Sequence, residues 1–146
     1  MLSFLFDTDA VSETLRPHPA PGYLAWLKAI PRQHLHISTV TIAEMLEGAH
    51  RLPNPTPLAR RIEELVLPAY THLAFDVEAA RIFGSLAGDL RKVGTPVADL
   101  DLMIAATAIA SDLELVTGNL KHFERVRGLR ICRAFVDGRL EPIRKR

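Results

Sequence analysis

Short apolar runs alternate with segments of helical periodicity along this chain, and that alternation limits the fold more than any other feature of the sequence. Runs of strand length occupy residues 2–6, 35–38, 73–75, 113–117 and 129–132. No repeat or low-complexity tract interrupts the pattern. Strands that alternate with helices predict an α/β fold, in which helices cover a central sheet.

The segments between these runs carry apolar residues three and four positions apart, which is typical of helices with one buried face. The predicted helices span residues 10–15, 22–30, 41–51, 58–66, 77–92 and 99–111. The helix at 77–92 would bury five side chains, which are Ala80, Phe83, Leu86, Ala87 and Leu90. Gly94 suits the left-handed residue that ends this helix.

Length and composition indicate a single domain over residues 1–146. A chain of 146 residues with 48% hydrophobic content buries about two thirds of its unfolded surface, so folding requires no disulfide. The one cysteine, Cys132, has no partner for an internal disulfide. The N-terminal apolar run is too short for a signal peptide or a membrane span, so we expect a cytoplasmic protein without a membrane segment.

Charge is distributed unevenly along a chain whose net charge is only +1. Residues 121–146 hold nine basic and three acidic side chains, which gives +6 for this segment and −5 for residues 1–120. One interpretation is a surface that accepts phosphates beside a separate pocket that binds cations. The alternative is a solvated face, because Arg125, Arg127, Arg130 and Arg133 alternate with apolar residues as on an exposed strand edge.

Carboxylates stand where apolar segments end or begin. Asp7 and Asp9 directly follow the first run, and ligands bind where strands leave an open α/β sheet. Either residue could instead cap the helix at 10–15 by accepting its free N–H groups. Asp99 and Asp101 are two residues apart, so on a helix they point to nearly opposite sides. We expect Asp99 to be the N-cap and Asp101 to face a pocket.

Glu44, Asn119 and His122 are further polar candidates for the same site. Glu44 lies one turn into a predicted helix, where Thr41-x-x-Glu44 is also a capping-box pattern that serves only the helix end. Asn119 follows a strand and can complete the site or form an Asx-turn. His122, taken alone, is either a ligand or a hydrogen-bonded structural residue.

Four segments together resemble a known family. They are residues 6–9 (FDTD), 38–44 (STVTIAE), 96–108 (PVADLDLMIAATA) and 116–123 (VTGNLKHF). Each is short, but they span most of the chain in the order found in PIN-domain ribonucleases. The sequence therefore resembles that family, and especially the VapC-type toxins of bacterial toxin–antitoxin pairs.

The resemblance implies a PIN-like three-layer α/β/α fold with a central, mostly parallel sheet of four to five strands. It also implies an endoribonuclease that acts as a toxin, with Asp7, Glu44 and Asp101 as catalytic residues and as ligands of Mg²⁺ or Mn²⁺. The chemistry agrees, because carboxylates held close together raise one another's pKa unless a divalent cation neutralises them. We expect Asp7 and Asp101 to ligate the cation, and Glu44 to bind it through water or to orient the attacking water.

Three further residues are expected to support this site. Thr8 and Asn119 would hold ligands and substrate in place, and His122 would lie beside them. Two positions depart from the family's commonest pattern. Asp9 stands where many relatives have Asn, and His122 stands where many have another acidic residue.

The resemblance also implies partners. They are an RNA substrate, such as a tRNA or a ribosomal RNA, a cognate VapB-type antitoxin that inserts a basic side chain into the acidic pocket, and a second copy of the chain in a homodimer. Five apolar residues on predicted helices are candidates for the antitoxin groove and equally for the core, namely Trp26, Ile42, Met45, Leu46 and Leu65.

Two other functions stay open at this point. Residues 7–11 (DTDAV) also resemble the nucleophile motif of haloacid dehalogenase-type phosphatases, in which Asp7 would be phosphorylated and Lys92 would assist. The second alternative is a PIN-like module that binds RNA or protein without cutting. Carboxylates without a cation weaken the binding of phosphates, which argues against a pure RNA-binding module.

Overall fold

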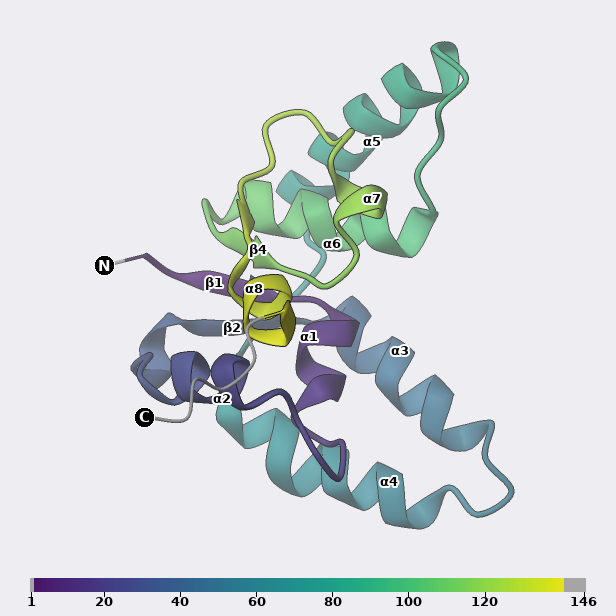
Figure 1. Cartoon of the computed structure of the whole chain (residues 1–146). Coiled ribbons are helices and arrows are strands. Elements are labelled where there is room, and N and C mark those ends of the chain that lie inside the picture. Colours follow the sequence, from purple (N-terminus) through teal and green to yellow (C-terminus); the bar gives the residue numbers. More distant parts are fainter. Residues whose placement is uncertain (1, 141–146) are drawn as a thin grey trace.

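A five-stranded parallel sheet forms the centre of the molecule (Figure 1). The structure, a computed structural model, describes residues 2–140, with side chains as far as Gly138. In order across the sheet, the strands are β3 (Thr71–Leu73), β2 (Leu35–Ser38), β1 (Phe4–Phe6), β4 (Glu114–Val116) and β5 (Ile131–Cys132). Every pairing is parallel, which confirms the predicted parallel sheet.

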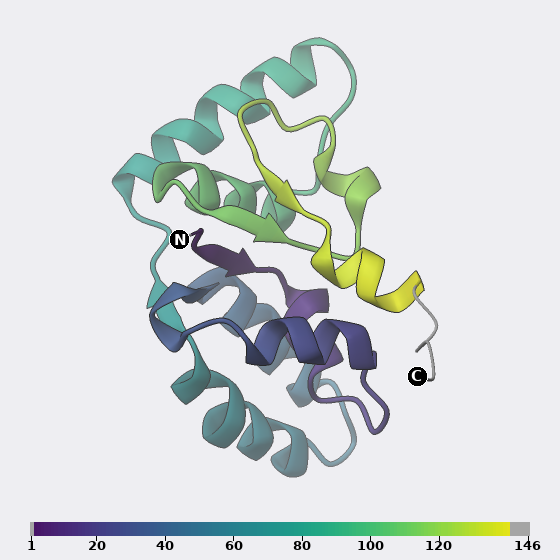
Figure 2. The ribbon, with the colours of Figure 1, turned by 60° about the vertical axis from the view of Figure 1, so that its left-hand side comes forward.

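Helices cover both faces of this sheet (Figure 2). On one face lie α1 (Thr8–Glu13), α2 (Pro21–Lys28), α3 (Thr39–His50), α4 (Thr56–Arg61) and α8 (Ala134–Leu140), with the short helical turns η1 (Arg32–His34), η2 (Ile62–Val66) and η3 (Leu67–Ala69). On the other face lie α5 (Val77–Lys92), α6 (Asp99–Ala110) and α7 (Leu120–Phe123). The predicted three-layer α/β/α fold is confirmed. In the described part of the chain, no helix is long and apolar enough to cross a bilayer.

The central strand is apolar at every position because both of its faces are covered. Phe4 and Phe6 lie in the core beneath α1 to α4, and Leu5 lies in the core beneath α5 to α7. Val116 and Leu115 of β4 divide between the two cores in the same way. The first charge of the chain, Asp7, therefore follows a strand that is buried on both sides.

The contact of α8 with α2 requires a glycine. Tyr23 of α2 is fully buried, packs against Phe135 with ring centroids 4.6 Å apart and the ring planes tilted by 54°, and donates its hydroxyl to the carbonyl of Ala10 at 2.7 Å. A Cβ added at Gly138 would lie 2.6 Å from the backbone nitrogen of Tyr23. Only a residue without a side chain lets the two helices approach this closely.

Some element boundaries differ from the prediction for local reasons. α1 begins at Thr8 rather than at residue 10, because Asp7 is its N-cap and accepts the N–H of Ala10 at 2.9 Å. α3 begins at Thr39, capped by Ser38, and not at residue 41. In both cases the capping side chain stands three residues before the predicted start, so the helix begins two residues earlier than expected.

Other differences from the prediction concern which side chains are buried and where elements begin, and the local sequence does not reveal them. Ala80 is exposed rather than buried, and Ala79 takes its place in the core. The predicted strand at 73–75 lies two residues earlier, at β3. The predicted helix at 58–66 divides between α4 and η2. The bounds of α5 are as predicted, and Gly94 at φ 73° follows it.

The prediction of basic residues on a strand edge is wrong. Arg125 and Arg127 lie in the segment between α7 and β5, and Arg130 and Arg133 flank the two residues of β5 without belonging to it. A strand of two residues is too short to present an alternating row of arginines.

Candidate active site

The candidate residues follow the carboxyl ends of the central strands. From β1 the chain moves outward to β2 and β3 and then crosses to β4 on the other side of β1. In open α/β sheets, ligands bind in the crevice at such a switch point. Asp7 follows β1, Asn119 follows β4, and Glu44 lies in the helix that follows β2. The parallel pairing brings all three to the same edge of the sheet.

Asp7 is buried more deeply than the other acidic residues of this edge, with 4% of its surface exposed. Its Oδ1 accepts the N–H of Ala10 at 2.9 Å, and its Oδ2 accepts the hydroxyl of Thr117 at 2.5 Å. Burial raises the pKa of Asp7 from 3.8 to about 7 although both hydrogen bonds lower it, and Asp9 and Asp101 raise it further. Asp7 therefore caps α1 and lines the site at once.

Two side-chain hydrogen bonds connect α1 to its neighbours. Thr8 Oγ1 donates to Glu44 Oε1 at 2.8 Å, so α1 orients the glutamate of α3. Asn119 Nδ2 donates to Asp9 Oδ2. The N–H of Asn119 also donates to Thr117 Oγ1 at 3.0 Å. Thr8 and Asn119, expected as supporting residues, each contact one carboxylate.

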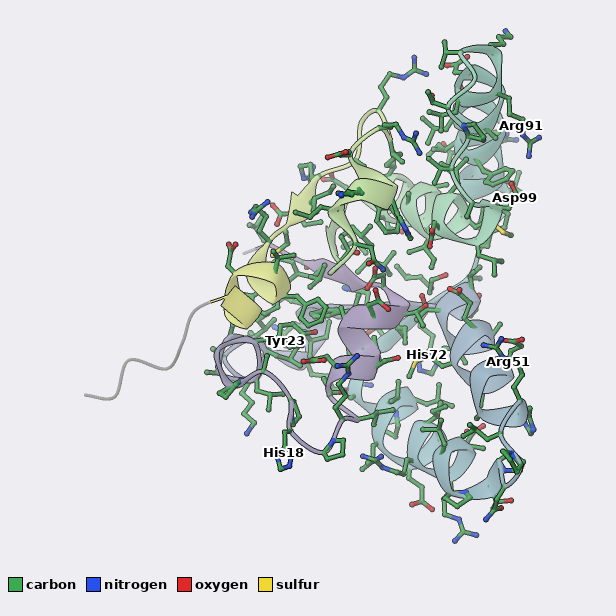
Figure 3. All side chains as sticks on the ribbon, turned by 45° about the vertical axis from the view of Figure 1, so that its right-hand side comes forward. His18, Tyr23, Arg51, His72, Arg91 and Asp99 are labelled. Atoms are coloured by element: carbon green, nitrogen blue, oxygen red, sulfur yellow. The ribbon has the colours of Figure 1, made fainter. Side chains whose placement is uncertain are left out.

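The helix α6 presents Asp101 and Asp99 in different directions. His122 Nδ1 of α7 lies 3.2 Å from Asp101 Oδ2 at the cavity. Asp99 instead pairs with Arg91 of α5 at 3.2 Å, away from the cavity (Figure 3). The N-cap of α6 is Ala98, which makes no side-chain cap, so the predicted capping role of Asp99 is wrong. Asp99 occupies the first helical position, where a carboxylate still interacts favourably with the helix dipole.

The capping-box interpretation of Glu44 is also wrong. Ser38 caps α3, and its hydroxyl accepts the N–H of Val40 at 3.1 Å. Thr41 lies inside the helix, and its buried hydroxyl has no hydrogen-bond partner in the described chain. Glu44 is thus not needed at the helix end, and its carboxylate lines the cavity instead.

A cavity of about 180 Å³, which we call the carboxylate cavity, brings these side chains together. Its lining consists of Asp7, Thr8, Asp9, Glu44, Asp101, Ile104, Asn119 and His122. All of the residues expected at the site from the sequence line it. Asp9, one of the two carboxylates that follow the first apolar run, lines it as well. Thr117 holds Asp7, a contact that the sequence did not assign to it, although its position directly after a strand was an available signal.

The carboxylate cavity is strongly acidic. No Lys or Arg of the described residues lines it. Burial raises the pKa of Glu44 and of Asp101, and neighbouring carboxylates raise both further, whereas Thr8 lowers the pKa of Glu44 and His122 lowers that of Asp101. Such a set favours binding of a divalent cation, which would relieve the repulsion among the carboxylates.

The donor chemistry fits Mg²⁺ or Mn²⁺, which prefer oxygen ligands. Among the described residues, no three acidic, histidine or cysteine side chains are arranged to hold one ion directly. Mg²⁺ usually binds through one or two carboxylates and keeps several waters. The cavity suits that mode of binding better than a closed set of protein ligands.

An apolar groove of about 580 Å³ adjoins the carboxylate cavity and shares Thr8 and Glu44 with it. Its apolar lining comes from α1, α3, α4 and adjacent residues, and includes Leu15, Met45, Leu52, Leu58 and Ile62. Two arginines at the groove are neutralised, Arg16 by Glu13 at 3.2 Å and Arg51 by Glu47 at 3.3 Å. Of the five apolar residues considered for an antitoxin groove, only Met45 lines it, and Trp26 packs against the aromatic core.

Comparison with known proteins places this geometry in a family. The PIN domain family matches residues 4–129, which include every residue of the carboxylate cavity. The VapC ribonuclease Y4jK of Sinorhizobium fredii is 32% identical over 125 residues, which cover 82% of this chain and 89% of that protein. The chain belongs to the PIN-domain family of VapC-type toxins. The phosphatase alternative loses its support, since Lys92 does not line the cavity that holds Asp7.

Other members of the family are similar over most of their length. The tRNA(fMet)-specific endonuclease VapC of Salmonella typhimurium is 31% identical over 131 residues, which cover 90% of this chain and 97% of that protein. The DNA-bound VapBC structure from Salmonella typhimurium superposes with a TM-score of 0.81 at 31% identity, covering 90% of this chain and 98% of that chain. The FitAcB structure from Neisseria gonorrhoeae gives 0.79 at 30% identity, with coverage of 88% and 96%.

Proposed function

We propose that this VapC-type chain is an endoribonuclease, the toxin of a toxin–antitoxin pair, and that it hydrolyses RNA phosphodiester bonds in the carboxylate cavity. The observation that carries the proposal is the convergence of Asp7, Asp9, Glu44 and Asp101 on one cavity at the switch point of the sheet. A relative of similar length is named as a tRNA(fMet)-specific endonuclease, so a tRNA is the first substrate to test, followed by ribosomal RNA.

Asp7, Glu44 and Asp101 are the proposed catalytic residues, and Mg²⁺ or Mn²⁺ is the proposed cofactor. Asp7 and Asp101 would hold the cation directly, and Glu44 through a water molecule. When bound, the cation supplies Lewis-acid chemistry that offsets negative charge as it develops at the phosphate. Deep burial of Asp7 supports this role, because a buried carboxylate gains most from a neighbouring positive charge.

Glu44 is the proposed base for the attacking water. Thr8 holds one of its oxygens at 2.8 Å, and Oε2 makes no hydrogen bond to any described residue. Burial raises the pKa of Glu44, which brings it closer to the range in which a carboxylate accepts protons effectively near neutral pH. His122 and Asn119 hold Asp101 and Asp9, respectively, in place around the substrate.

The apolar groove is the proposed site for a VapB-type antitoxin. It adjoins the carboxylate cavity at Thr8 and Glu44, so an apolar segment in the groove would bring a following basic side chain to the carboxylates. The VapBC neighbours support a partner of this kind. The family resemblance is the basis for two further proposals, a homodimer and a cytoplasmic location.

The proposal is tested by mapping new 5′ ends in total cellular RNA after incubation with the purified, antitoxin-free protein and Mg²⁺ or Mn²⁺. We expect discrete ends that disappear when EDTA is added. RNA that is bound but never cut by folded protein would refute the nuclease and favour the non-catalytic binding module.

A further inference from the structure

The basic residues near the C-terminal end of the described chain fall into two groups. Three arginines are paired with carboxylates, Arg127 with Asp89 at 2.8 Å, Arg130 with Asp112 at 2.7 Å and Arg133 with Asp137 at 3.4 Å. A neighbouring carboxylate thus partly balances the charge of each of these three arginines. Fewer arginines of this segment are therefore free to bind an anion than its composition suggests.

Lys121 and Arg125 form the second group. Within residues 2–138, neither side chain has an ion pair with a carboxylate. Arg125 donates to the carbonyl oxygen of Pro96 at 3.3 Å, a neutral acceptor that orients the guanidinium and leaves its charge unbalanced. Both residues are exposed, so both charges face solvent.

These two cations lie beside the carboxylate cavity. Arg125 lines a hollow of about 210 Å³ together with Asp101 and His122. Lys121 lines another hollow, of about 340 Å³, together with Asn119 and His122. His122 also lines the carboxylate cavity, so the three spaces meet along α7.

The apolar groove, which adjoins the carboxylate cavity at Thr8 and Glu44, has no unpaired positive charge comparable to Lys121 and Arg125. Both arginines that line it, Arg16 and Arg51, are paired with glutamates. An RNA strand that approaches an acidic cavity needs cations nearby, because carboxylates repel its phosphates. In the described chain, the two unpaired cations at the cavity lie on the α7 side.

We propose that Lys121 and Arg125 bind two backbone phosphates of the RNA whose chain enters the carboxylate cavity. The RNA then crosses the carboxylate cavity along α7, and the apolar groove remains free for the antitoxin. This inference rests on the proposed ribonuclease function and adds to it the residues that hold the substrate. A lysine point charge and an arginine fork both suit phosphate oxygens.

The test measures binding of a fluorescein-labelled, mixed-sequence single-stranded RNA oligonucleotide by anisotropy over a range of salt concentrations. All proteins carry Asp101→Asn, so that the RNA stays intact. The test variant adds Lys121→Ala and Arg125→Ala, and the matched control adds Arg127→Ala and Arg130→Ala. Each phosphate contact to a single strand contributes about 0.7 to the slope of log K against log salt concentration, so the test variant should lose about 1.4. The control should keep the parent slope.

A conservative variant separates charge from structure. Lys121→Arg with Arg125→Lys keeps both charges and should keep the parent slope, whereas a purely structural role would let this exchange weaken binding as much as alanine does. In cleavage assays without Asp101→Asn, the alanine pair should raise KM and leave kcat nearly unchanged.

Equal slopes for the test and control variants, with RNA still bound by the parent and cut by the wild type, would overturn this inference and leave the ribonuclease proposal standing. Failure of the parent to bind RNA, together with failure of the wild type to cut it, would overturn both.

Discussion

Replacement of Asp7 by asparagine should stabilise the metal-free protein at neutral and alkaline pH. Asparagine has nearly the same shape, and its Oδ1 can still accept the N–H of Ala10, which Asp7 accepts at 2.9 Å. Its amide can donate to the hydroxyl of Thr117, which has two lone pairs. The change therefore removes a buried charge and keeps the cap of α1.

The magnitude follows from the pKa of Asp7, which burial raises from 3.8 to about 7. Because the pKa is higher in the folded protein than in the unfolded chain, the favourable contribution of Asp7 is complete below pH 3.8 and is lost as the pH rises to about 7. At 1.36 kcal/mol per pKa unit, the full loss is about 4 kcal/mol. Between pH 5 and pH 7, the free energy of unfolding of the Asp7→Asn variant should gain roughly 2 kcal/mol relative to wild type.

The assay is urea unfolding in EDTA across this pH range, followed by the fluorescence of Trp26, the one tryptophan of the chain. Its indole packs against Phe4 with ring centroids 5.2 Å apart, so it reports loss of the core. Curves of stability against pH that run parallel for the two proteins would refute the reasoning. Mg²⁺ should then stabilise the wild type more than the variant, because a ligand that binds only the folded state raises its stability.

Two further substitutions test other parts of the account. Thr8→Val removes the hydrogen bond to Glu44 and should lower the RNA cleavage rate roughly tenfold, because such a bond is worth about 1.5 kcal/mol and 1.36 kcal/mol is tenfold in rate. An unchanged rate would contradict the positioning role. Gly138→Ala should destabilise the protein by about 1–3 kcal/mol in urea unfolding, because the new methyl group meets the backbone of Tyr23. Gly84→Ala is the control, because its methyl group meets nothing within 4 Å. This substitution should stabilise α5 by roughly 0.5–1 kcal/mol. Equal effects on stability at both glycines would exclude the close contact between Gly138 and Tyr23.

The resemblance to PIN-domain ribonucleases predicted that Asp7, Glu44 and Asp101 form one site. Local patterns alone pointed clearly only to Asp7, which follows a buried strand, whereas Glu44 also fitted a capping box and Asp101 lies on a helix that follows another helix. Strand order was less accessible, since apolar runs do not reveal which strands are neighbours. The β1–β4 pairing, which creates the switch point, joins segments more than a hundred residues apart.

Local patterns failed where long-range contacts decide the outcome. Arg127 and Arg130 are exposed, as the solvated-face interpretation predicted, but they do not lie on a strand, and each pairs with a carboxylate of another segment. Asp99 looked like an N-cap, but it is the first residue of α6, with Ala98 as the N-cap, and its carboxylate pairs with Arg91 of α5. Thr117 gave no local sign that its hydroxyl would reach Asp7. None of these choices can be made without knowing which helices and strands are adjacent.

The most direct test of the central claim compares two aspartates of the same helix. Asp101→Asn and Asp99→Asn remove the same charge two residues apart, but only Asp101 lines the carboxylate cavity. In RNA cleavage with saturating Mg²⁺ or Mn²⁺, Asp101→Asn should lose about a hundredfold or more, since metal-ion catalysis is worth several kcal/mol and 1.36 kcal/mol is tenfold in rate. Asp99→Asn should cut at the wild-type rate. Equal rates for the two variants would contradict the assignment of the cavity as the site of RNA hydrolysis.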